Sequence, residues 1–457
     1  MVLIHAGAAL SALTLPYMVT SHQSTSLIVL GACVLAVALG WARNSASRLG
    51  LLGAVLLIGV PLVPGMQETR QPQLFALLVV SVSILGMSWR LAAKRRRRAR
   101  VSYAAFIVLS VLTCLTVGVE YGDQFRLLTG LVLASTVALP LAISAAAEDS
   151  EMRTILGGLT VIAVVAAGVA FYEAGAKAPL YKFTTFQTHA NPLITFRASA
   201  FFGHPLVLCV FLSFVALANM IRPRWDTSKW YTSRLLTVAV PLAGAAASGS
   251  RSIALFIAVG ILGIVFMRQD TVRRKWVAFL MVCAALVLGY FTLSGDSALV
   301  DRFGGLTTGE QSVRLNGFSV VTGITQGLEV FIGAGPRSVA AAYLTSMSGA
   351  TFGTVDNEFF TTYADYGLAG LALIVMLVLR LIAALRSKGP GPWAQSMVVA
   401  SMAPLAAFVV MDTLSWPILA LLFGLGSGAT MNVAPATPAT STASAHEAVL
   451  TPHHTSS

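Results

Sequence analysis

The sequence predicts an all-α membrane protein: a polytopic bundle of about 12–14 transmembrane helices with one long extracytoplasmic loop that is itself partly helical. Of the 457 residues, 56% are hydrophobic and 11% are charged, whereas a soluble protein carries about 25% charged residues. Many apolar runs reach the ~20 residues that cross a hydrocarbon layer. Alternation at the period of a strand is absent, so the spans are predicted to be helices and not barrel strands.

Fourteen apolar runs are predicted as spans, and the shortest of them set the lower limit of about twelve. The membrane domain is expected to cover residues 1–433. The tail 434–457 is rich in Ala, Thr, Ser and Pro and is expected to be a disordered cytoplasmic segment. The predicted spans are about 3–19, 26–42, 49–64, 73–92, 101–119, 127–147, 154–172, 203–221, 235–249, 252–267, 276–294, 364–385, 393–411 and 414–432.

Basic residues predict the orientation of these spans. The net charge is +12, and the run from Lys94 to Arg100 is the strongest cytoplasmic marker. Strict alternation places the basic loops 222–234, 268–275 and 386–388 on the same side, with both termini. Topology accounts for this charge, so no nucleic-acid partner is expected. The N-terminus lacks a basic segment followed by a cleavage site, and the first span is expected to remain.

The cysteines give no sign of a metal or disulfide framework. All four lie inside apolar runs, where a cysteine acts as a small core residue. No metal and no cofactor are expected for this chain.

The opposite, extracytoplasmic face is predicted to receive the loops 66–72, 120–126, 173–202, 248–252, 293–363 and 412–417. The loop Leu293–Tyr363 is the one long polar interval of the chain. Lys and Arg are disfavoured on this face, so those present require a reason other than topology. They are Arg70, Arg126, Lys177, Lys182, Arg197, Arg251, Arg302, Arg314 and Arg337.

Several motifs follow one another on this predicted face. Arg197-Ala-Ser-Ala-Phe-Phe-Gly-His204-Pro enters one span, and Gly249-Ser-Arg251-Ser enters another. The long loop holds Gln-Ser-Val-Arg314-Leu-Asn-Gly, then Gly-Ala-Gly-Pro-Arg337, then Val-Asp-Asn357-Glu, and Gly-Leu-Ala-Gly follows it. Together, in this order, the motifs resemble those of the O-antigen ligase and Wzy-type O-antigen polymerase family of membrane glycosyltransferases, over roughly residues 197–370.

The resemblance implies transfer of a saccharide from a polyprenyl-diphosphate lipid to a glycan, lipid or protein acceptor outside the cytoplasmic membrane. Arginine forks bind phosphate bidentately and stabilise charge on a leaving oxygen, and a diphosphate leaves without a metal. Arg314 and Arg251 are accordingly expected to bind the diphosphate, with Arg197 as a third ligand. Arg337 and Arg302 are expected to assist.

The acceptor hydroxyl must lose a proton, and the sequence offers two candidate bases. Family members that resemble ligases carry a histidine in the loop just before the final Asn, where this chain has Asp356. Asp356 or His204 is the expected base, unless the proton leaves late and no strong base is needed. Asn357 is a further candidate for substrate binding. The missing histidine favours a polymerase over a ligase.

Each assignment has a structural alternative. Arg314 is also explained as a solvated loop charge and Arg251 as an interfacial residue that extends to water. His204 precedes a proline typical of a helix start, and Asp356 or Asn357 is placed to cap the next helix.

Other functions compete with the transferase. A flippase for lipid-linked saccharide predicts ionisable residues in the middle of its spans, whereas the cations here gather at one face. A cell-wall glycan polymerase and a structural membrane protein without chemistry are further alternatives.

Overall fold

The computed structural model describes residues 96–117, 123–180, 197–221, 235–250, 252–266, 319–339, 341–342, 357–386, 391–414 and 416–432. Of these residues, 84% are helical and none lies in a strand. The predicted all-α fold is therefore confirmed.

Helix is found in every predicted span from 101–119 to 252–267 and in the three from 364–385 onward. The predicted spans 3–19, 26–42, 49–64, 73–92 and 276–294 lie outside the described residues. The elements are α5 (Arg96–Thr116), α6 (Asp123–Ala146), α7 (Asp149–Ala176), η3 (Ala200–Phe202), α8 (Pro205–Ile221), η4 (Leu235–Ala239), α10 (Val240–Ala247), α11 (Ile253–Phe266), α15 (Glu329–Ile332), α17 (Glu358–Arg386), α18 (Pro392–Ala400), α19 (Met402–Ala407), α20 (Pro417–Ala429) and η5 (Thr430–Asn432).

Two helix boundaries differ from the predicted spans for identifiable reasons. α17 begins at Glu358, two turns before the predicted span 364–385, because its polar first turns are excluded by an apolar window. The predicted span 393–411 is divided at Ser401 into α18 and α19. Pro404 is the third residue of α19 and has no N–H to donate to the carbonyl of Ala400, which disfavours one continuous helix over 393–411.

Among the described helices, three are long and apolar enough to cross a membrane: Arg126–Ala146 in α6, Glu151–Ala176 in α7 and Glu358–Arg386 in α17. Five shorter apolar helices accompany them. Length and composition thus agree with a protein that resides in a membrane.

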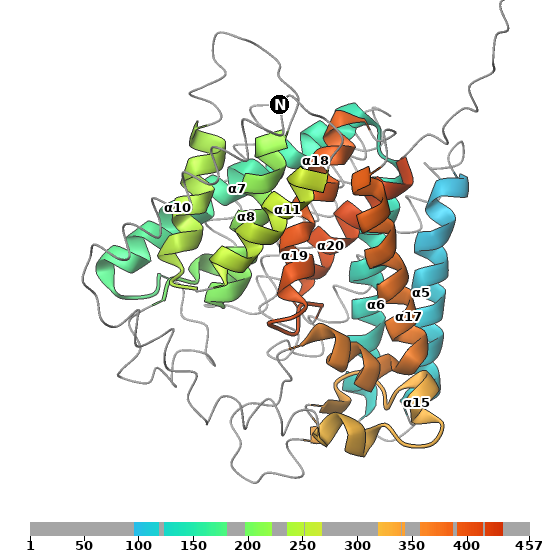
Figure 1. Cartoon of the computed structure of the whole chain (residues 1–457). Helices are drawn as coiled ribbons and strands as arrows, with labels where there is room; N and C mark the ends of the chain where they lie inside the picture. Colours follow the sequence, from blue (N-terminus) through green and yellow to red (C-terminus); the bar gives the residue numbers. More distant parts are fainter. Residues whose placement is uncertain are drawn as a thin grey trace, which may run out of the picture.

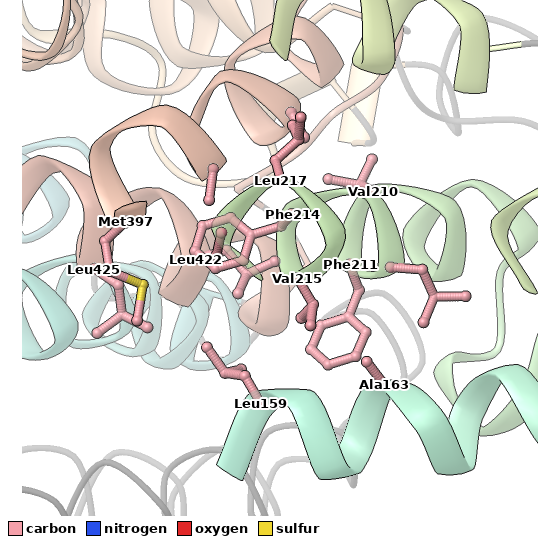
Figure 2. Packing of buried hydrophobic residues seen from close by; sticks show 14 of the residues in the cluster. Leu159, Ala163, Val210, Phe211, Phe214, Val215, Leu217, Met397, Leu422 and Leu425 are labelled. Atoms are coloured by element: carbon pink, nitrogen blue, oxygen red, sulfur yellow. The ribbon is translucent and has the colours of Figure 1, made fainter. Parts of the chain in front are cut away.

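The main core forms around α8, which is apolar on all sides and buried along nearly its whole length. A helix without a polar face is stable only when other helices surround it. Phe211 and Val215 of α8 face Leu159 and Ala163 of α7, while Phe214 faces α18 and α20, as Figure 2 shows. The core therefore joins helices that are far apart in the sequence.

α6 packs against α5 on one side and α20 on the other (Figure 1). Close approach to α20 depends on small residues: a Cβ added at Gly424 would lie 2.7 Å from Cγ of Pro140. Such small-residue contacts are common where helices meet in membranes. The outer sides of α5 and α17 expose large apolar residues, Leu115 and Leu379 among them, which suits contact with lipid.

The candidate residues lie toward one end of this bundle. In Figure 1, α15, the start of α17 and the connection from α19 to α20 lie on its lower side, and the segment that leads into α8 begins there too.

Candidate functional site

Arg197 and His204 flank a short, firmly packed segment at the start of α8. Between them, Phe201 and Phe202 are buried, and the ring of Phe202 lies 4.8 Å from that of Phe211, measured between centroids. Arg197 itself is exposed. The two aromatic rings therefore anchor the segment in the core, and Arg197 lies at its exposed start.

Glu173, in the last turn of α7, fixes the backbone of this segment. Its side chain is fully buried, and Oε2 accepts hydrogen bonds from the N–H groups of Ser199 (3.0 Å) and Ala200 (2.8 Å). Oε1 accepts a third from the N–H of Leu180 at 2.9 Å. One carboxylate thus holds both ends of the connection between α7 and η3.

His204 is half-buried, and its ring lies 5.5 Å from that of Trp416 between centroids. Nδ1 accepts a hydrogen bond from the N–H of Leu206 at 3.2 Å. In the neutral ring, an accepting Nδ1 places the proton on Nε2. His204 is therefore arranged as a hydrogen-bond donor through Nε2, which weakens its expected role as a base.

Two separate sequence motifs meet beside Arg197. Gly249 has a φ of 64°, and a Cβ added there would lie 3.4 Å from Cγ of Arg197. Ser248 is buried, with Oγ donating to the carbonyl of Ala245 at 2.6 Å. The side chain of Arg197 therefore passes over the turn between α10 and α11. Arg251 follows in this turn but lies outside the described residues.

We call this region the Arg197 corner: Glu173, Arg197–His204, Ser248–Gly249 and Trp416. A second region, the Asp365 corner, consists of Arg126, Gly333–Ser338, Glu358, Asp365 and Asp412.

Asp365 holds the turn that carries Arg337. Oδ2 accepts the N–H of Arg337 at 3.1 Å, and Oδ1 accepts the N–H and the Oγ–H of Ser338 at 3.1 and 2.8 Å. Arg126 of α6 grips the same turn from the other side, donating to the carbonyls of Ala334 (2.6 Å) and Pro336 (3.1 Å). The φ of Arg337 is 61°, a left-handed conformation that a non-glycine residue keeps only when its surroundings enforce it.

Two glycines allow the turn to lie directly on a kink in α17. Gly367 has a φ of 63° within the helix, and an added Cβ would collide with the backbone of Phe331. A Cβ on Gly333 would likewise collide with the backbone of Asp365 and Tyr366. The N–H of Ala334 donates to the carbonyl of Ala364 at 2.8 Å across this crossing.

Arg337 lies among carboxylates. Burial lowers the pKa of its guanidinium, while the charges of Asp365 and Asp412 raise it. The positive charge of Arg337 is thus already offset by acidic neighbours. The expected role of Arg337 in binding the diphosphate stays a prediction.

Asn357 caps α17. Its Oδ1 accepts hydrogen bonds from the N–H groups of Phe359 (3.0 Å) and Phe360 (3.3 Å), the pattern of an N-cap. Capping of the next helix, the structural alternative considered for Asn357, is therefore observed. The expected role of Asn357 in substrate binding stays a prediction.

Glu358 ties α17 to the connection between α19 and α20. The side chain is buried, with Oε2 accepting the N–H of Leu414 and Oε1 accepting the Oγ1–H of Thr362, both at 2.7 Å. Its own N–H donates to the carbonyl of Phe408 at 2.8 Å.

The segment Phe408–Trp416 links the two corners. Asp412 interacts electrostatically with Arg337, and Trp416 lies against His204. The N–H of Trp416 donates to the carbonyl of Thr413 at 3.2 Å, which keeps the segment compact. Arg197, His204, Arg337 and Asn357 are thus placed at one end of the bundle. Arg302, Arg314 and Asp356 lie outside the described residues, as does Arg251.

Sequence reasoning assigned no role to the residues that position the site: Arg126, Glu173, Glu358 and Asp365. Arg126 was noted only as one of the cations on the predicted extracytoplasmic face. A signal for Asp365 was present, because an acidic residue inside an apolar span is rarely placed there without a role. No such signal exists for Glu173, whose partners follow it by many residues.

In the part of the chain that the structure describes, no group of three or more His, Cys, Asp and Glu side chains is arranged to hold a metal ion. Comparison with models of known protein families finds no match, and neither does comparison with curated proteins.

Proposed function

We propose that the chain is a membrane glycosyltransferase that transfers a saccharide from a polyprenyl diphosphate to an acceptor on the outer face of the cytoplasmic membrane. The main support is the meeting of two motifs at one end of an apolar bundle: Arg197 lies over Gly249, two residues before Arg251, and His204 completes the corner. An exposed arginine at the end of apolar helices suits a substrate whose diphosphate stays at the surface and whose prenyl chain enters lipid.

The proposed chemistry assigns the diphosphate to Arg197, Arg251 and Arg314, because arginine binds phosphate oxygens with paired, charge-assisted hydrogen bonds. The acceptor oxygen forms a bond to the anomeric carbon, and the bond from that carbon to the diphosphate oxygen breaks. The electron pair leaves with the diphosphate, whose growing charge the arginines stabilise. Neither a metal nor a cofactor is part of the proposal.

His204 and Asp356 have different parts in this scheme. In this scheme the Nε2–H of His204 donates to an oxygen of the donor substrate, while Nδ1 accepts from the N–H of Leu206. Asp356 is then the residue proposed to take the proton of the acceptor hydroxyl. The acceptor is a second lipid-linked glycan for a polymerase, or a lipid or protein for a ligase, and the product is a surface polysaccharide.

A flippase for lipid-linked saccharide is the second candidate. One observation favours it: α17 is kinked at Gly367, and Asp365 is buried within its apolar span. Interrupted helices and buried ionisable residues are typical of transporters. Against this reading, Asp365 accepts hydrogen bonds from the Arg337–Ser338 turn and so already has partners.

In-vitro turnover distinguishes these functions. The purified protein in nanodiscs is given polyprenyl-diphosphate oligosaccharide, and the products are analysed by gel and mass spectrometry. The proposal predicts longer lipid-linked glycans, or transfer of a saccharide to an added acceptor. The protein is also reconstituted in liposomes. Movement of intact donor across that bilayer, without any transfer product, would instead establish the transporter and refute the transferase.

A further inference from the structure

Glu173 is a buried carboxylate for which the proposed chemistry has no use. It lies in the last turn of α7, fully removed from solvent. The negative end of the helix dipole is there, so an acidic side chain at this position is disfavoured unless other groups compensate it. Its place therefore requires an explanation from the contacts that it makes.

Those contacts are three backbone N–H groups. Oε1 accepts from Leu180, and Oε2 accepts from Ser199 and Ala200, at 2.8–3.0 Å. A carboxylate is purely an acceptor, and it matches three donors better than a neutral side chain would. Hydrogen bonds to a charged acceptor are also stronger than those between neutral groups.

The backbone held in this way is strained. Ala200 has a φ of 45°, in the left-handed region that is unfavourable for an L-residue with a Cβ. Strain of this kind persists only where the surroundings enforce it, and such residues concentrate at functional sites. Glu173 binds the N–H of the strained residue itself, and Phe201 and Phe202 are buried directly after it.

We propose that Glu173 is the positioning residue of the Arg197 corner: it holds the Ser199–Ala200 backbone so that Arg197 and His204 face the same donor molecule. Arg197 precedes the held N–H groups by two residues, and His204 follows them by four. The statement about the backbone stands by itself, whereas the statement about the donor rests on the proposed function.

Glu151 offers a matched control on the same helix. It is buried in the first turn of α7, and its Oε2 accepts the N–H of Glu148 at 2.6 Å. Glu173→Gln and Glu151→Gln thus remove the same charge from opposite ends of one helix. Glutamine keeps one accepting oxygen and turns an N–H₂ donor toward the remaining N–H groups.

Hydrogen exchange tests the backbone claim without any assay of activity. In peptides that cover Arg197–His204, Glu173→Gln is expected to raise the exchange rate at Ser199 and Ala200 by about 10- to 100-fold, since one lost charge-assisted hydrogen bond has roughly that effect. Glu151→Gln is expected to leave this rate unchanged. Equal exchange in wild type and Glu173→Gln would overturn the inference. If Glu173→Gln does not fold, Glu173→Asp keeps the charge, withdraws the oxygens, and is expected to raise the same rate by less.

A double-mutant cycle tests the link to the donor. Glu173→Gln is expected to raise the KM for donor in the wild-type background and to add little in an Arg197→Ala background, because both changes act through one segment. Additive effects would show general destabilisation and overturn the inference. Absence of turnover in the wild type would refute the proposed function, and the exchange result would still decide the role of Glu173.

Discussion

The hydrogen bond that His204 accepts at Nδ1 determines which ring nitrogen carries the proton. Nδ1 accepts from the backbone of Leu206, so Nε2 carries the proton of the neutral ring. A residue that donates a hydrogen bond is replaceable by another donor, whereas a general base is not.

His204→Gln is therefore predicted to keep turnover within about tenfold of wild type, because the amide retains a donor. His204→Ala is predicted to lose about 100-fold, within the range measured for groups that bind the reacting atoms. Steady-state turnover of lipid-linked donor provides the test. If both variants lost the same large factor, His204 would act as the base.

At Asn357, the cap and the substrate contact predict different results. Asn357→Ala removes the acceptor for the N–H groups of Phe359 and Phe360 and is predicted to lower stability by about 1 kcal/mol. Asn357→Asp keeps an accepting oxygen and is predicted to match wild type in both melting temperature and turnover. A stable but inactive Asn357→Asp protein would show that the amide contacts substrate.

Among the elements, the crossing of the 333–338 turn with α17 depends most sharply on residue type. Gly333→Ala places a methyl group against the backbone of Asp365 and Tyr366, and that backbone would have to shift to accommodate it. We predict a loss of several kcal/mol, about 3 or more, since the clash adds to the cost of a positive φ.

Substitutions at two other glycines separate the cost of the clash from the cost of the positive φ. Thermal or denaturant unfolding measures both. Gly327 has a φ of 59° with open space around it, so Gly327→Ala is predicted to cost about 1–2 kcal/mol from conformation alone. Gly323 has open space and an ordinary φ, and Gly323→Ala is predicted to change stability little or to raise it. Equal stability of the Gly333 and Gly327 variants would contradict the close crossing.

Sequence patterns predicted helices better than helix ends. Long apolar runs such as 154–172 and 203–221 predicted α7 and α8, since a helix surrounded by other helices needs no polar face. The same apolar criterion placed the start of α17 too late, because Glu358 and Asp365 look like loop residues until their partners are known. Those partners, Leu414 and Ser338, belong to other segments, and a pattern along one stretch of chain does not contain them.

For the whole molecule, the proposal depends most on which side of the membrane holds the two corners. The exposed Leu328 lies near the end of the bundle that holds both corners, while the exposed Arg386 ends α17 at the other. Basic loops predict that the Arg386 side is cytoplasmic.

In a variant without the four native cysteines, a membrane-impermeant maleimide is predicted to label Leu328→Cys in intact cells. Arg386→Cys is predicted to react only after permeabilisation. Labelling of both cysteine variants in intact cells, or of Arg386→Cys alone, would contradict the predicted orientation. It would thereby also refute the proposed function.

Arg197 and His204 were found from sequence as members of one motif, whereas the grouping of that motif with Gly249 and Trp416 came from the fold. The acidic surroundings of Arg337 were likewise invisible, because Asp365 and Asp412 follow it by many residues. The order of the motifs along the chain thus pointed to candidate residues, and their surroundings came only from the fold.

Binding of the donor lipid to Arg197 tests the account most directly. Binding of polyprenyl diphosphate to wild type, Arg197→Ala and Arg380→Ala is compared in nanodiscs, with Arg380 as an exposed arginine far along α17. We predict that Arg197→Ala weakens binding by about 10- to 100-fold, the range for one charged hydrogen-bonding group, while Arg380→Ala binds as wild type does. Equal binding by all three proteins would contradict the assignment of the Arg197 corner to the diphosphate.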